Sequence, residues 1–207
     1  MKLIGSTTSP YVRKVRIYLE ETSLPHTFVR VDAWQPSPAL LVSAPLGKVP
    51  VLERDNGRAL FDSTLIIAYL ESLLPPPRRL VPTQGEERWA ILRWHAFAHG
   101  IIDAIVARVL ELRRPEALQM KERLAHEEVR IARAIAAIEA ALDGSGYLVA
   151  ERLSLADLML GAAMHYIDIR YPHDWRSCAP RLAAWCRVIH DRPSFVSTQP
   201  PGFVRPA

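Results

Sequence analysis

The sequence predicts a chain of two domains, a small α/β domain with a mixed sheet followed by an all-helical domain. Up to residue 76, short β-rich runs and helical runs follow one another in the order βαβ and then ββα. Every long segment after residue 86 has helical periodicity. Between these regions lies a stretch with prolines at positions 75, 76, 77 and 82, which is typical of a domain linker.

The first domain is expected to begin with a strand at residues 2–5 and a helix that opens at Ser9-Pro10. Ser accepts an orphan backbone N–H at an N-cap, and Pro is favoured at the first helical position because it has no N–H to satisfy. We expect Arg13 and Lys14 to lie opposite the helix's apolar stripe. Residues 26–31 then predict a second strand, parallel to the first through a right-handed crossover.

A hairpin and a second helix complete the predicted first domain. Residues 34–45 contain three prolines and predict a loop with a short helical turn at 39–43. Strand-like residues 49–53 and 58–61 flank Asn56-Gly57, which is a strong hairpin signal. A helix is expected to start at Asp62-Ser63 and to stop before Pro75.

The second domain is predicted to be a set of antiparallel helices at about residues 86–114, 116–142, 155–171 and 179–191. Ser154 and Asp157 have the spacing of a capping box at the start of the third of these helices. A helix start fully explains that spacing, so Asp157 is expected to be structural.

Composition and charge exclude several classes of protein. The net charge of +4 comes from basic residues interleaved with acids, which gives no footprint for nucleic acid. No membrane span or signal-like segment is expected, so we expect a cytoplasmic protein. Cys178 and Cys186 fit neither a metal knuckle nor a CxxC pair and are expected to be buried free thiols. His95 and His99 lack the Glu of an HExxH motif, so no metal is predicted.

Three stretches, residues 9–15, 45–52 and 61–70, resemble motifs of the cytosolic glutathione S-transferases, in particular the serine-type members of bacteria that are similar to the theta and beta classes. The resemblance covers the whole chain. It implies a thioredoxin-like domain at residues 1–76, a linker at 77–85 and an all-helical domain at 86–207. It also implies a cytoplasmic homodimer that acts as a transferase in detoxification.

The chemistry that this resemblance implies is activation of the glutathione thiol for attack on a hydrophobic electrophile or a hydroperoxide. The thiolate is the nucleophile, and Ser9 would stabilise it by donating a hydrogen bond to sulfur. The alternatives are that Ser9 only caps its helix, or that Ser6, Thr7, Thr8 or Tyr11 supplies the hydroxyl. Because the first domain has no cysteine, thiol–disulfide exchange through the enzyme is not expected.

The resemblance also implies how glutathione is held in the first domain. A cis peptide bond before Pro50 would present the backbone of Val49 to the cysteinyl part, and Lys48 would reach the glycyl carboxylate. Pro50 could instead simply begin a strand, and Lys48 could be a surface lysine.

At the other end of the tripeptide, Asp62 would bind the γ-glutamyl ammonium and Ser63 its carboxylate. Asp103 would assist from the partner subunit of a dimer. The alternatives are a helix cap at Asp62-Ser63 and, for Asp103, an ion pair within the chain to an arginine such as Arg108.

The co-substrate pocket is expected to involve residues of the helical domain, namely Trp89, Arg93, Trp94, His165 and Tyr166. The sequence does not identify the electrophile. A second hypothesis from a different class is a non-catalytic interaction module, because the same architecture also serves as a binding domain in translation and transcription proteins.

Overall fold

The computed structural model describes residues 1–144, 146–149 and 151–204, and its contacts divide the chain into two compact units. The first unit holds residues 1–83 together with Pro193–Phe203, and the second holds the described residues of 84–192 together with Val204. The bounds expected from the sequence, 1–76, 77–85 and 86–207, remain a prediction about independently folding domains. The contacts add the segment 193–203 to the first unit.

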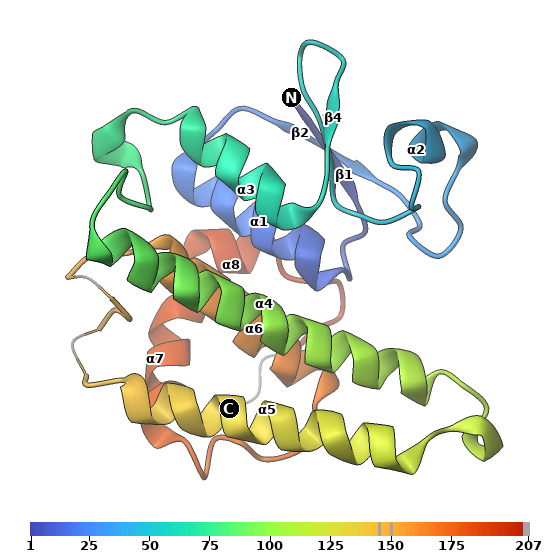
Figure 1. The fold of residues 1–207 in the computed structure, drawn as a ribbon, viewed down its shortest axis with the longest axis vertical. Coiled ribbons are helices and arrows are strands. Elements are labelled where there is room, and N and C mark those ends of the chain that lie inside the picture. Colours follow the sequence, from blue (N-terminus) through green and yellow to red (C-terminus); the bar gives the residue numbers. More distant parts are fainter. Residues whose placement is uncertain (145, 150, 205–207) are drawn as a thin grey trace. The chain divides into compact units, whose positions relative to one another are not determined.

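The first unit is built on a four-stranded mixed sheet in the order β2-β1-β3-β4 (Figure 1). Its strands are β1 (Lys2–Gly5), β2 (Thr27–Arg30), β3 (Val51–Glu53) and β4 (Ala59–Leu60). β1 is parallel to β2 and antiparallel to β3, and β4 is antiparallel to β3. The predicted mixed sheet of the first unit is therefore confirmed.

Each face of this sheet has its own core. Ile4 and Val51 are register partners, and they pack with Leu40 of α2 (Pro38–Ser43) and with Ala44. Since side chains alternate along a strand, the paired Leu3 and Leu52 point to the opposite face. Both are fully buried, and α1 (Pro10–Thr22) and α3 (Ser63–Ser72) pack against each other on that side of the sheet (Figure 1).

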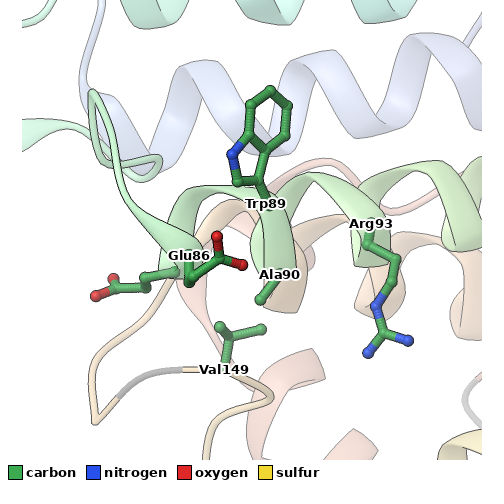
Figure 2. A pocket seen from close by; sticks show the side chains of 6 residues that line it. Glu86, Trp89, Ala90, Arg93 and Val149 are labelled. Carbon is green, nitrogen blue, oxygen red and sulfur yellow. The ribbon is translucent and has the colours of Figure 1, made fainter.

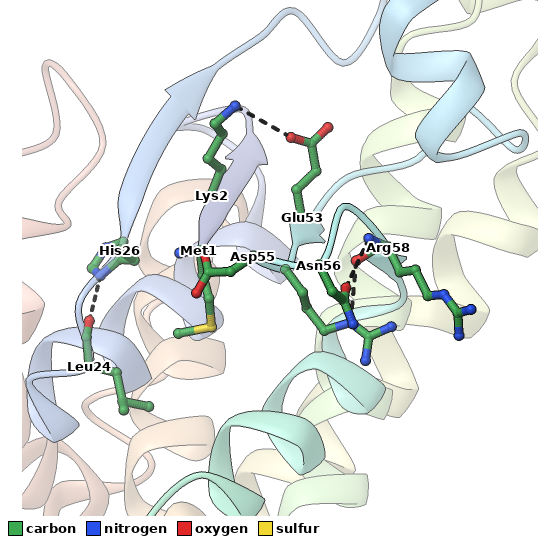
Figure 3. A network of polar contacts seen from close by, with 9 residues as sticks. Met1, Lys2, Leu24, His26, Glu53, Asp55, Asn56 and Arg58 are labelled. Atoms are coloured by element: carbon green, nitrogen blue, oxygen red, sulfur yellow. Dashed lines mark hydrogen bonds and ion pairs between the residues drawn. The ribbon is translucent and has the colours of Figure 1, made fainter.

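The hairpin of β3 and β4 is closed by polar contacts (Figure 3). Gly57 takes a positive φ of 76°, and the side chain of Asn56 accepts the N–H of Arg58 at 3.1 Å. The Met1 ammonium lies 2.8 Å from Asp55 Oδ1. These contacts confirm the turn that the Asn-Gly pair predicts.

Two cations of α1 are buried, contrary to the expectation from the helical pattern. Arg13 is 3% exposed and Lys14 is 1% exposed. Arg13 Nη2 donates to the carbonyl oxygen of Phe195 at 3.1 Å, in α8 (Pro193–Ser197), and Ser194 Oγ donates to Glu21 Oε1 at 2.6 Å. The expectation was wrong for both residues. For Arg13 the cause is α8, about 180 residues along the chain, which packs against α1.

A buried carboxylate ties the end of the first unit to its core. Tyr18 Oη donates to Glu71 Oε1 at 2.7 Å, and the N–H of Leu80 donates to the same oxygen at 3.1 Å. Burial raises the pKa of Glu71, although these hydrogen bonds and the charge of Arg79 act to lower it. The segment after α3 is therefore held by a side chain of α3.

The second unit consists of α4 (Glu86–Leu112), α5 (Lys121–Ala141), α6 (Leu155–Arg170) and α7 (Pro180–His190). α6 is buried along nearly its whole length and packs most extensively against α4. Asp157 is fully buried, and its Oδ2 accepts the N–H and the hydroxyl of Ser154 at 2.9 and 2.8 Å. The capping box and the structural role of Asp157 are therefore confirmed.

By length and apolar composition, α4 is the one helix in the described part of the chain that could cross a membrane. Helices at the core of soluble proteins pass the same test, and α4 packs against α5 and α6 within the second unit. Its composition therefore gives only weak support to a membrane span.

We expect Glu71→Gln to raise stability at neutral pH. Because the folded-state pKa of Glu71 is raised, the wild type loses stability as the pH rises from below the ordinary pKa of a glutamate through the folded pKa. Glutamine still accepts the Tyr18 hydrogen bond and does not ionise. The difference in unfolding free energy should therefore grow with pH and then level off, measured by urea unfolding from about pH 4 to about pH 8.

The matched control is Glu20→Gln, which removes an exposed carboxylate from α1. A stability difference between wild type and Glu71→Gln that is the same at every pH would contradict the buried-carboxylate argument.

Candidate functional site

Three backbone segments meet at one edge of the sheet. Because β1 and β3 are antiparallel, with Ile4 opposite Val51, the end of β1 lies beside the start of β3. β4 runs antiparallel to β3 with Leu60 opposite Leu52, so the chain leaves β4 at the same edge. This edge therefore gathers Ser9 after β1, Val49-Pro50 before β3, and Asp62-Ser63 after β4. The sheet register brings together most of the candidates that the resemblance implies.

Ser9 is the N-cap of α1, and its Oγ accepts the N–H of Val12 at 3.3 Å. This bond uses a lone pair of the hydroxyl oxygen, so the hydroxyl hydrogen can still be donated to another acceptor. None of the hydrogen bonds within the described residues uses the Ser9 hydroxyl as a donor. Capping the helix and donating to a ligand are therefore compatible roles for this side chain.

The neighbouring hydroxyls differ from Ser9 in their contacts. Ser6 Oγ and Thr8 Oγ1 lie 3.0 Å apart, and Ser6 Oγ also accepts the N–H of Thr8 at 3.3 Å. These two side chains are engaged with each other. Ser9 alone among them sits at the N-terminus of the helix, where the macrodipole favours negative charge.

Ser63 is the most unusual polar residue at this edge. Its side chain is buried, with 1% exposed, and its Oγ has no hydrogen-bond partner among the described residues. It does not cap α3, because Asp62 does so: Asp62 Oδ1 accepts the N–H of Thr64 at 2.8 Å and of Leu65 at 3.4 Å. A buried hydroxyl without a partner costs about 1–3 kcal/mol, which calls for an explanation.

The segment before β3 carries the third group of candidates. The peptide bond between Val49 and Pro50 is cis. The paired residues of β3 begin at Val51, so the backbone of Val49 lies beyond the paired part of the sheet. Pro50 is buried and Lys48 is exposed. Lys48 therefore carries its charge in solvent next to Val49, as a surface lysine would.

Asp103 lies in the second unit, on α4, and its side chain is 52% exposed. Its Oδ1 is 3.6 Å from Nε2 of His99, one helical turn earlier. Arg108 is not the partner of Asp103 within the chain, because Arg108 is buried and its Nε lies 3.2 Å from Glu128 Oε1. Asp103 is therefore an exposed acid of α4.

The residues expected at a co-substrate pocket fall into two separate groups within the second unit. Glu86, Glu87, Trp89, Ala90, Arg93 and Val149 line an open hollow of about 540 Å³ (Figure 2). Trp94, His165 and Tyr166 are instead buried. Positions 89 and 93 are one helical turn apart on the same side of α4, whereas position 94 falls on its buried side.

The described residues give little support for cysteine-based or metal-based chemistry. No group of three or more His, Cys, Asp or Glu is placed to hold a metal there. Cys186 is buried, and burial raises the pKa of its thiol. Cys178 is exposed, so the expectation of a buried thiol was wrong for this residue.

Comparisons with known proteins agree with this architecture. Residues 3–78 match the family described as glutathione S-transferase, N-terminal domain, and residues 121–187 match its C-terminal domain. The uncharacterized GST-like protein YibF of Escherichia coli K12 is 33% identical, and the alignment covers 97% of this chain and 99% of that protein.

Two solved structures have the same fold at a TM-score of 0.90. The glutathione S-transferase of Methylobacillus flagellatus with glutathione bound is 35% identical, over 96% of this chain and 98% of that chain. The enzyme of Methylobacterium radiotolerans in complex with glutathione sulfonate is 33% identical, over 100% and 97%. Both matched domains, in the expected order, and relatives aligned over nearly their full length show that this chain belongs to the glutathione S-transferase family.

Proposed function

We propose that the protein is a glutathione transferase that binds glutathione at the sheet edge of the first unit and activates its thiol. The observation that carries the proposal is the buried Ser63 hydroxyl, which has no partner within the described residues. It lies in the first turn of α3, where backbone N–H groups and the macrodipole favour an anion. The γ-glutamyl carboxylate would supply the missing acceptor.

The other residues of the edge fit the remaining parts of the tripeptide. Asp62 uses Oδ1 to cap α3, and its exposed carboxylate can also pair with the γ-glutamyl ammonium. The backbone of Val49 would pair with the cysteinyl unit, and Lys48 would bind the glycyl carboxylate. Solved relatives that hold glutathione or glutathione sulfonate support this assignment.

Ser9 would be the catalytic residue, because it can stabilise the thiolate of bound glutathione. A free thiol has a pKa of about 8.5, so it is mostly protonated at neutral pH. The Ser9 hydroxyl can donate to sulfur while its oxygen keeps the bond from Val12, and the N-terminus of α1 adds favourable potential. The thiolate would then attack a hydrophobic electrophile or reduce a hydroperoxide, in a detoxifying role in the cytoplasm.

A transferase assay with a generic aryl halide, combined with retention on immobilised glutathione, tests the proposal. Retention with turnover is expected. Retention without turnover of any electrophile or hydroperoxide in a panel would favour the non-catalytic interaction module. Absence of retention would overturn the glutathione site itself.

We expect Ser63→Ala to weaken glutathione binding without weakening the fold. The variant removes a hydroxyl that has no partner in the described residues, so the free energy of unfolding should stay equal or rise. One hydrogen bond to a carboxylate is worth about 1.5–3 kcal/mol, or about tenfold or more in the dissociation constant. Calorimetric titration and thermal unfolding measure the two effects.

The matched control for that variant is Ser72→Ala at the other end of α3. Ser72 Oγ donates to the carbonyl of Tyr69 at 2.6 Å, so its loss should affect stability slightly and glutathione binding not at all. An unchanged dissociation constant for Ser63→Ala would remove Ser63 from the site.

We expect Ser9→Ala to slow turnover more than it weakens glutathione binding. Loss of a charge-assisted hydrogen bond to sulfur should raise the apparent pKa of bound glutathione and cost about 1.5–3 kcal/mol in transition-state stabilisation. The ultraviolet absorbance of the thiolate, followed against pH, reports this pKa.

The chain offers a close control in Ser37→Ala. Ser37 caps α2, is followed by Pro38, and accepts the N–H of Leu40 at 3.3 Å, the same distance as at Ser9. Both variants should lose about 1 kcal/mol of stability as caps, but only Ser9→Ala should change the thiol pKa. The same pKa in both variants and in the wild type would leave Ser9 a helix cap.

We also propose that the protein forms a homodimer, in which Asp103 of one subunit would assist the glutathione ammonium of the other. The exposed position of Asp103 on α4 is compatible with this role. Light scattering should then give about twice the chain mass of 23.3 kDa at micromolar concentration. A stable monomer would reject the dimer and remove Asp103 from the site.

A further inference from the structure

A group of basic and aromatic side chains lies where α4 and α6 end. Arg108 belongs to α4, Arg113 follows its last residue, and Tyr166 and Arg170 lie one helical turn apart on α6. The two helix ends are in contact, because Arg108 Nη1 donates to the carbonyl oxygen of Arg170 at 3.2 Å. These residues all belong to the second unit.

Arginine at a helix C-terminus often serves the helix itself, by donating to its last carbonyls. Here Arg108 fills that role for α6, since it donates to the carbonyl of residue 170. The guanidinium of Arg170 instead lies near the Tyr166 hydroxyl, whose pKa its positive charge acts to lower. Its Nε is buried and has no hydrogen-bond partner among the described residues. Arg170 therefore has a donor that the helix end does not use.

The nearby carboxylates are already engaged. Glu128 Oε1 lies 3.2 Å from Arg108 Nε and 3.5 Å from His173 Nε2. Asp168, two residues before Arg170 and fully buried, pairs with Arg176 at 2.8 Å and accepts the indole N–H of Trp175 at 3.0 Å. Within the described residues, Arg170 thus makes no ion pair with an acid of its own unit.

Tyr166 adds a hydroxyl to this partly buried positive region. Its side chain is 7% exposed. Burial raises the pKa of Tyr166, while the positive charges of Arg170 and Arg113 act to lower it. The hydroxyl therefore stays protonated at neutral pH and can act as a hydrogen-bond donor beside two guanidinium groups.

We propose that Arg170, Tyr166 and Arg113 form a binding site for the carboxylate group of a small organic acid. The planar guanidinium presents parallel N–H donors that match the two oxygens of a carboxylate. The ligand would satisfy the buried Nε of Arg170 and pair with its positive charge. This site lies in the second unit and does not depend on the proposed binding of glutathione in the first.

Titration with benzoate, followed by amide chemical shifts in the presence of saturating glutathione, tests the site. Benzoate should cause saturable shifts around residues 166–171, and neutral benzamide should bind about tenfold or more weakly. Glutathione is added first so that benzoate does not occupy the anion positions proposed for the first unit. A calorimetric titration of glutathione alone tests the other proposal separately.

Arg170→Met should weaken benzoate binding by about tenfold or more, whereas Arg133→Met, which removes an exposed arginine of α5, should leave it unchanged. Tyr166→Phe removes only the hydroxyl and should weaken binding several-fold, which keeps the test valid if Arg170→Met does not fold. Shifts confined to the first unit, equal binding of benzamide, or unchanged affinity in both Arg170→Met and Tyr166→Phe would overturn the proposal.

Discussion

The antiparallel pairing of β1 with β3 and of β3 with β4 is the constraint on which the candidate site depends. It places the end of β1, the start of β3 and the end of β4 at one edge. A slip of one residue in this pairing would exchange the two faces of a strand and move Leu3 or Leu52 out of its own core into the one formed by Ile4 and Val51. Gly5, the last residue of β1, allows α1 to pack closely against the end of this strand, because a Cβ at position 5 would lie 2.4 Å from Val12 Cγ2. The N-terminus of α1 is thereby held close to the edge.

Local capping geometry alone does not distinguish a functional serine from a structural one. Ser9 and Ser37 precede a proline, cap a helix and accept an N–H at the same distance, yet only Ser9 lies at the edge shared with Val49 and Ser63. Ser63 differs from both, since Asp62 performs the capping and leaves the Ser63 hydroxyl buried without a partner in the described residues. A buried hydroxyl without a partner lowers stability and has no role in the fold, so it is a stronger indication of a ligand than a helix-capping geometry is.

The sequence predicted the features that short-range signals encode. Ser9-Pro10, Asn56-Gly57 and Asp62-Ser63 each set a local backbone geometry, and from them followed the starts of the first helices and the hairpin. The binding candidates at the edge came from the resemblance, and the strand order came from the structure. The burial of Arg13 could not be predicted, because its partner Phe195 is 182 residues away. The same holds for Tyr18 and Glu71, which are 53 residues apart. A helical pattern identifies polar residues but not what later covers them.

The ends of α4 and α6 give another example of a contact that the sequence pattern does not reveal, and this one bears on function. The spacing of Tyr166 and Arg170 is visible in the sequence, but a basic residue at a helix end has an ordinary explanation in the macrodipole. Only the contact from Arg108 to the carbonyl of Arg170 shows that another side chain already serves this helix end. The buried Nε of Arg170 and the buried Oγ of Ser63 are thus comparable, since the local structure uses neither group. In each unit the ligand hypothesis rests on a polar group that folding alone would leave unsatisfied.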